Sequence, residues 1–183
     1  MRRRTFDYFV SWTGALLTVV FIVAGIGMFI GYNFTSSQVR NQLQEQKVFF
    51  PTKTQSDYRD LVAAHLTQYA GKQVLTGSEA EIFADKIIAV DTLGISGGKT
   101  YSQLSSQSLT EPSNTALKNQ VELVFRGDTL RGLLLNAYAF GFIGVIALYG
   151  AIGMMVAAVI MLVLTLLGFR HYKQADPTDV IPI

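Results

Sequence analysis

Residues 132–169 of the chain read GLLLNAYAFGFIGVIALYGAIGMMVAAVIMLVLTLLGF and contain no charged side chain. A helix needs about 20 predominantly apolar residues to cross a hydrocarbon core of roughly 30 Å, so this stretch is long enough for a transmembrane span. Arg170, His171 and Lys173 follow it directly. The stretch therefore predicts a membrane helix that ends at these residues.

A second uncharged stretch, residues 9–31, reads FVSWTGALLTVVFIVAGIGMFIG. As a helix that rises 1.5 Å per residue it covers about 35 Å, which is enough for another span. The basic residues Arg2, Arg3 and Arg4 would also suit a cleaved signal peptide. Such peptides have an apolar region of roughly 7–15 residues followed by a small-residue cleavage site, and neither feature is present here. We therefore predict a retained transmembrane helix.

The basic residues also predict the orientation of both spans. They flank the N-terminal side of the first span and the C-terminal side of the second. Because cytoplasmic flanks are enriched in Lys and Arg, this pattern predicts a multi-pass plasma membrane protein with both termini in the cytoplasm. The predicted order is a cytoplasmic N-terminus (1–8), transmembrane helix 1 (9–31), an extracytoplasmic helical domain (32–132), an apolar outer part of helix 2 (133–148), transmembrane helix 2 (149–169) and a cytoplasmic tail (170–183).

The uncharged stretch before Arg170 is longer than one span requires. Counting about 21 residues back from Arg170 reaches only Tyr149. Residues 133–148 are nevertheless strongly apolar, and tilting the helix accommodates only a few extra residues. We therefore expect protein to cover this part above the membrane, with Gly141 and Gly144 allowing a bend or a close helix contact.

Small residues recur at a spacing of four in both predicted spans. Closely spaced small residues let membrane helices approach each other, so they predict an interface between the two spans or between protomers. Glycine and alanine are also common in membrane helices generally, which is the simpler explanation. The pairs are Gly27/Gly31, which we favour as a contact face, Ala147/Ala151 and Gly153/Ala157.

The segment between the spans also predicts helices. Apolar side chains recur at helical spacing from Tyr58 to Tyr69, with Ser56 as the expected N-cap and Gly71 as a stop. The first span is expected to continue as a helix through residues 37–47, which contain good helix formers. Residues 48–51 are strand-like but too short to make a sheet.

Capping boxes predict two further helix starts, at Thr76–Glu79, with Ser78–Glu81 as an alternative frame, and at Thr100–Gln103. The first of these helices is expected to carry Phe83, Ile87 and Val90 on one face and to end near Gly94. A last helix, from after Pro112 to Gly127, is followed by Asp128 as the expected cap of the second span. The predicted fold is an all-α membrane protein, with two transmembrane helices and a small helical extracytoplasmic domain packed on their outer extensions.

Composition argues against several kinds of chemistry. The chain has no cysteine, and its net charge of +2 does not make the basic face that nucleic-acid binding needs. His65 and His171 are predicted on opposite sides of the membrane and cannot share a metal, and His65 is expected to pack on the apolar side of its helix. Neither span holds an ionisable group of the kind that transport pathways use. We predict no catalytic residue, no cofactor and no metal.

Two local motifs resemble sites but have simpler explanations. Glu79, Glu81 and Asp85 lie along one side of a predicted helix, where acidic residues near an N-terminus are favoured by the helix dipole. Gly97-Gly98-Lys99-Thr100 resembles the end of a phosphate loop, but Leu93 stands where the first glycine of that motif belongs. We interpret it as a helix break followed by a capped helix.

A resemblance to a known family rests on residues 39–43 and 49–51, residues 69–74 with 76–77, residues 98–102 and residues 127–137. By these segments the whole sequence resembles a family of small, uncharacterised actinobacterial two-pass membrane proteins, often labelled aromatic ring-opening dioxygenases. Extradiol ring opening needs iron held by two histidines and a carboxylate, and the predicted topology separates the two histidines. The resemblance therefore implies a plasma membrane habitat and no mechanism.

The sequence favours a non-enzymatic accessory or assembly component of a membrane protein complex. Its expected contacts are the lipid bilayer and another membrane protein, or a second copy through the Gly27/Gly31 face. The alternative is an extracytoplasmic binding module that holds a lipid or another apolar ligand against residues 133–148.

Overall fold

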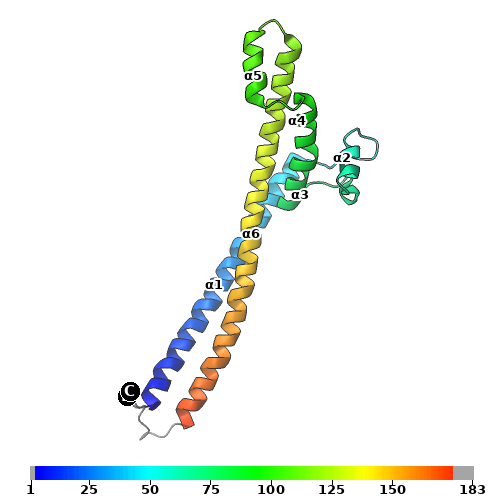
Figure 1. Cartoon of the computed structure of the whole chain (residues 1–183). Helices are drawn as coiled ribbons and strands as arrows, with labels where there is room; N and C mark the ends of the chain where they lie inside the picture. Colours follow the sequence, from blue (N-terminus) through cyan, green and yellow to red (C-terminus); the bar gives the residue numbers. More distant parts are fainter. Residues whose placement is uncertain (1–2, 175–183) are drawn as a thin grey trace. The chain divides into compact units, whose positions relative to one another are not determined.

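The computed structural model describes residues 3–174, which form helices, turns and an isolated antiparallel bridge between Phe49 and Gln73 (Figure 1). The all-α prediction is confirmed. Arg2 and the end of the predicted cytoplasmic tail, residues 175–183, lie outside the described residues. The helices are α1 (Arg3–Gln46), α2 (Tyr58–Ala63), the 3-10 helix η1 (Thr67–Tyr69), α3 (Gly77–Phe83), the π-helix η2 (Ala84–Ile88), α4 (Ala89–Ser96), α5 (Tyr101–Thr110) and α6 (Thr115–Gln174).

α1 and α6 are both long and apolar enough to cross a membrane. The predicted continuation of the first apolar helix is confirmed, since α1 runs on to Gln46. The predicted helix break at Gly127 is wrong, because α6 continues through it from Thr115 to Gln174 and Asp128 is no cap. A side chain at Gly127 would collide with Thr92 of α4, so this glycine permits close packing between helices.

The chain divides into two compact units, which are described separately. The two-helix unit comprises Met1–Phe34 and Gly144–Ile183, and the multi-helix unit comprises Thr35–Ile143. Each unit therefore contains one part of α1 and one part of α6.

The two-helix unit is an antiparallel helix pair. Gly14 of α1 lies opposite Thr165 of α6, and Met28 lies against Gly150. Near the Gly14 end of the pair an aromatic contact also joins the two helices, where Trp12 meets Phe169 at a ring-centroid distance of 6.2 Å. Four buried small residues of α6 recur at intervals of seven: Gly144, Ala151, Ala158 and Thr165.

The multi-helix unit has two hydrophobic clusters. The larger one joins the last turns of α1 to the middle helices and to Leu134 of α6. The smaller one packs Leu104 of α5 against Leu117 and Val124 in the first turns of α6. The buried members of the larger cluster are Val39, Leu43, Phe50, Leu61, Val74, Ala80, Phe83, Ala84, Ile87 and Leu134.

The single helix predicted from Tyr58 to Tyr69 is wrong, because the chain breaks at His65. The backbone amide of Leu66 donates to the carbonyl of Leu61 at 2.8 Å, and that of His65 donates to Val62 at 3.1 Å. With His65 in the left-handed region (φ 56°), these bonds form the Schellman motif that ends a helix. The predicted Ser56 cap is also wrong, since Asp57 holds the N-cap position.

Both predicted capping boxes are confirmed, at Thr76 with Glu79 and at Thr100 with Gln103. The helical face predicted after the first box is only partly right, because Phe83 and Ile87 are buried but Val90 is exposed. A π-turn at η2 explains the difference, since its wider i→i+5 winding rotates the residues that follow it. The helix ends at Ser96, with Gly97 in the left-handed region (φ 60°).

Candidate functional site: an exposed face of α6

One side of α6 is buried within the multi-helix unit. Leu134 is only 1% exposed and shares the larger cluster with Val39 and Leu43 of α1. About two turns onward the backbones themselves approach, because a side chain at Gly141 would lie 3.1 Å from the α-carbon of Gly77. Part of the apolar residues 133–148 is thus covered by the chain's own helices, as the sequence predicts, and Gly141 makes the expected close contact.

The opposite side of the same helical segment is exposed, and we call it the α6 face. Leu133, Phe140 and Ile143 are 59%, 53% and 56% exposed, respectively. A helix places residues at intervals of three and four on one side, which puts these side chains in a single stripe. The α6 face comprises Phe125, Thr129, Gly132, Leu133, Asn136, Phe140 and Ile143.

The α6 face has the composition of a contact surface. Large exposed apolar patches on a protein mark sites of protein, membrane or ligand contact, whereas single exposed apolar residues need no explanation. Thr129 and Asn136 interrupt the stripe with hydrogen-bonding groups, and Gly132 leaves open space where a side chain would stand. The arrangement can accommodate a second helix, which could approach at the glycine and hydrogen-bond beside it.

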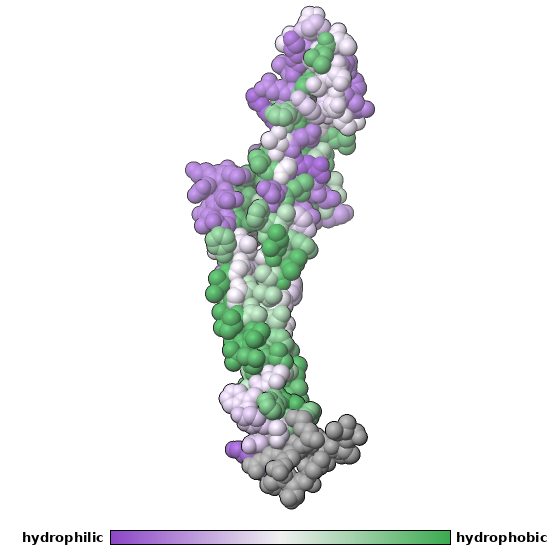
Figure 2. Space-filling model, turned by 90° about the vertical axis from the view of Figure 1, so that its left-hand side faces the viewer, coloured by the Kyte–Doolittle hydropathy of each residue, from purple (hydrophilic) through white to green (hydrophobic). Residues whose placement is uncertain are grey.

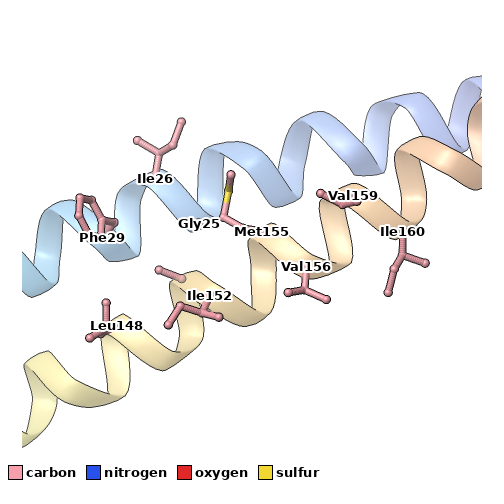
Figure 3. A pocket seen from close by; sticks show the side chains of 10 residues that line it. Gly25, Ile26, Phe29, Leu148, Ile152, Met155, Val156, Val159 and Ile160 are labelled. Atoms are coloured by element: carbon pink, nitrogen blue, oxygen red, sulfur yellow. The ribbon is translucent and has the colours of Figure 1, made fainter.

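An apolar groove of about 580 Å³ lies between α1 and α6 in the two-helix unit. Figure 3 shows Met155 beside Gly25, and a side chain at that glycine would lie 3.2 Å from the methionine sulfur. The surface of this unit is largely hydrophobic where Figure 2 shows it. The groove is lined by Gly25, Ile26, Phe29, Leu148, Ala151, Ile152, Met155, Val156, Val159 and Ile160.

Glycines and hydroxyl side chains face each other at one end of the helix pair. A side chain at Gly14 would lie 2.5 Å from the hydroxyl oxygen of Thr165, and one at Gly168 would lie 2.6 Å from that of Ser11. Thr18 donates to the carbonyl oxygen of Gly14 at 2.8 Å. These reciprocal contacts of small residues hold the two helices close together there.

The predicted contact at Gly27 and Gly31 is not part of this helix pair. Each has open space where a β-carbon would stand, and so has Gly153. Of the other small residues named in the sequence, Ala151 is buried in the pair, whereas Ala147 and Ala157 are only half-buried. The seven-residue repeat from Gly144 to Thr165 was the signal in the sequence that would have identified the contact side of α6.

The two histidines do not join any site in the described part of the chain. His65 is exposed at the end of α2, so its predicted packing on an apolar helix side is wrong. His171 is exposed in the last turn of α6. Among the described residues, no group of three His, Cys, Asp or Glu side chains is placed to hold a metal ion.

Two of the acidic side chains named in the sequence, Glu79 and Asp85, have structural partners. Glu79 accepts from the backbone amides of Leu75 and Thr76 at 2.9 and 3.0 Å, which fixes the start of α3. Asp85 pairs with Arg131 of α6 at 2.8 Å and so ties η2 to the long helix. Thr100 caps α5 after the glycine break, as predicted for residues 97–100.

Asp91 of α4 is a carboxylate whose surroundings disfavour its charged form. Burial raises the pKa of Asp91, and the nearby negative charges of Asp57 and Asp60 raise it further. The positive charge of Arg59 lowers the pKa of Asp91, but it offsets the rise only in part. One carboxylate oxygen of Asp60 is buried without a hydrogen-bond partner. This cluster of charges is a source of pH-dependent stability in the multi-helix unit.

Comparison with known proteins identifies no relative. No family model, no curated protein and no solved structure matches the chain.

Proposed function

We propose that this chain is a two-span plasma membrane protein whose outer domain binds another membrane protein, as a non-enzymatic accessory or assembly component. Both chain ends lie in the cytoplasm in this proposal, and the multi-helix unit lies outside. The α6 face is the observation that carries it, because it is an apolar stripe that the chain's own domain leaves exposed.

The contacts of the helix pair support the choice of residues 149–169 as the second span. Gly14 lies opposite Thr165 and Met28 lies against Gly150, so the apolar stretch 9–31 runs beside residues 149–169. The side chains there are mostly exposed and apolar, as lipid-facing residues are. A retained span also fits the length of this stretch better than a signal peptide does.

The α6 face belongs above the bilayer in this arrangement. Leu134 packs against Val39 and Leu43, and the neighbouring Arg40 and Glu45 are exposed charged residues of α1. Charged side chains are costly in the hydrocarbon region, so this level is aqueous. Apolar side chains in water gain roughly 25 cal/mol per Å² when a partner covers them, which favours binding at the α6 face.

Site-specific cross-linking in intact membranes tests the partner. A photoreactive benzoylphenylalanine replaces Asn136 at the centre of the α6 face, and a control replaces the exposed Val62 of α2. We expect an adduct with a different membrane protein from position 136 and none from position 62. The double substitution Leu133→Glu and Phe140→Glu should reduce the adduct at least fivefold, whereas Val62→Glu should leave it unchanged.

Three other outcomes would contradict the proposal. An adduct with the mass of two copies would make the α6 face a self-association surface. An adduct with lipid alone would favour the alternative function, an extracytoplasmic module that binds a lipid or another apolar ligand along residues 133–148. The same adduct from positions 136 and 62 would show that the α6 face has no special role.

A further inference from the structure

We infer that the groove between α1 and α6 holds one acyl chain of a membrane lipid. The inference rests on the proposed membrane location of the two-helix unit and concerns a different surface from the α6 face. Every residue that lines the groove is glycine, alanine, valine, leucine, isoleucine, methionine or phenylalanine. The walls therefore offer no hydrogen bond or charge to a headgroup, and an open apolar groove within a membrane faces the lipid acyl chains.

The length of the groove matches one leaflet. Its lining on α6 runs from Leu148 to Ile160, which corresponds to about 18 Å of helix. Half of a hydrocarbon core of roughly 30 Å is about 15 Å. The volume of about 580 Å³ leaves room for a single hydrocarbon chain along the open groove.

The ends of the groove indicate from which leaflet of the membrane the acyl chain enters. Phe29 lies near the end of the apolar stretch of α1 that precedes Tyr32, and Leu148 is the first lining residue on α6. This end of the groove is the outer side in the proposed topology. The lining ends at Ile160 of α6, and on α1 it is confined to Gly25, Ile26 and Phe29, so the groove lies beside the outer half of the stretch 9–31. The acyl chain therefore enters from the outer leaflet, with its methyl end near Val159 and Ile160.

A helix from a second copy fits this groove less well. A transmembrane helix would need a contact surface that continues across the core of roughly 30 Å. The groove lies beside only the outer part of the helix pair, because its lining on α1 is limited to Gly25, Ile26 and Phe29. A flexible hydrocarbon chain can end at mid-depth, which a membrane helix cannot do.

Lipid retention tests the inference directly. The full chain is placed in nanodiscs of palmitoyl-oleoyl phosphatidylglycerol, transferred to mild detergent and examined by native mass spectrometry. Ile152→Trp and Val156→Trp, both at exposed groove positions, should each reduce the most strongly retained lipid at least threefold. Val163→Trp is the control, since Val163 has a similar exposure on α6 (51%, against 52% for Ile152) and does not line the groove.

The inference is wrong if neither groove variant loses lipid while helicity is unchanged by circular dichroism. It is also wrong if the unsubstituted chain forms a dimer that both groove variants abolish, because a second copy would then occupy the groove. Neither result affects the partner proposed for the α6 face, which is read out by adducts from position 136.

Discussion

Asp91 illustrates how a single side chain acquires an energetic cost from its neighbours. It comes from α4, whereas Asp57 and Asp60 come from the start of α2, so the fold brings three carboxylates together. Burial is the largest cause of the raised pKa of Asp91, and the two neighbouring carboxylates add to it. The ionised form of Asp91 is therefore less stable in the folded chain than in the unfolded chain.

We predict that Asp91→Asn stabilises the multi-helix unit at neutral pH. The contribution of Asp91 to stability is fully present below its ordinary pKa of 3.8 and is lost as the pH rises through the raised pKa of the folded state. The gain should stay below about 1 kcal/mol, because a partly exposed charge is screened. Thermal unfolding of the unsubstituted chain and of Asp91→Asn at pH 7 and pH 3.5 measures this gain. We expect a higher Tm for Asp91→Asn at pH 7 and no difference at pH 3.5.

Asp128→Asn is the matched control, since it removes the same charge at an exposed position of α6. A lower Tm for Asp91→Asn at pH 7 would contradict the prediction. It would mean that attraction to Arg59 outweighs burial and the two neighbouring carboxylates.

His65 shows what sequence periodicity misses at a single residue. Apolar residues continue at helical spacing on both sides of it, so the pattern predicts an unbroken helix. Its positive φ and the bonds from Leu66 and His65 back to α2 end that helix instead. Glycine usually takes this conformation, and a histidine there gives no comparable signal in the sequence.

α1 and α6 show how packing between two helices determines which side of each helix is buried. The small residues of α6 that face α1 repeat every seven positions, and Gly14 and Gly25 of α1 meet side chains of α6. The GxxxG pair Gly27/Gly31 lies outside this contact. Spacing alone shows which residues share a side of a helix, whereas the partner helix determines which side is buried.

We predict that Gly14→Leu weakens the helix pair by about 1–3 kcal/mol, because the new side chain overpacks the contact with Thr165. Gly27→Leu is the matched control and should change stability by less than about 0.5 kcal/mol, as it points into open space. The single tryptophan, Trp12, packs on Phe169, so its fluorescence reports separation of the helices during denaturation in bicelles.

Equal losses for the two variants would contradict this assignment of the contact side. A loss of dimer caused by Gly27→Leu alone would instead support the self-association predicted for the Gly27/Gly31 face.

At the scale of the whole molecule, the proposed topology can be measured directly because the chain has no cysteine. We predict that Ser106→Cys, on an exposed position of α5, reacts in intact cells with a maleimide that cannot cross membranes. Lys173→Cys, in the last turn of α6, should react only after the membrane is permeabilised. The opposite labelling pattern would show that the orientation in the membrane is reversed. Labelling of both cysteine variants in intact cells would contradict the two-span arrangement.

Much of the helical architecture follows from local sequence. Long uncharged stretches determine the two long helices, and Thr76 with Glu79 and Thr100 with Gln103 determine two helix starts. These features depend on residues within a few positions of one another, and their hydrogen bonds form without any distant partner. Capping and hydropathy are therefore readable before the fold is known.

Only the tertiary structure decided which part of the apolar residues 133–148 is covered. Composition makes Leu133 and Leu134 equivalent, yet Leu134 is buried against Val39 and Leu43 while Leu133 is exposed. Neighbouring positions on a helix point about 100° apart, so the side that is buried depends on where distant helices pack. The same packing determined that α6 continues through Gly127 and that its other side remains exposed for a partner.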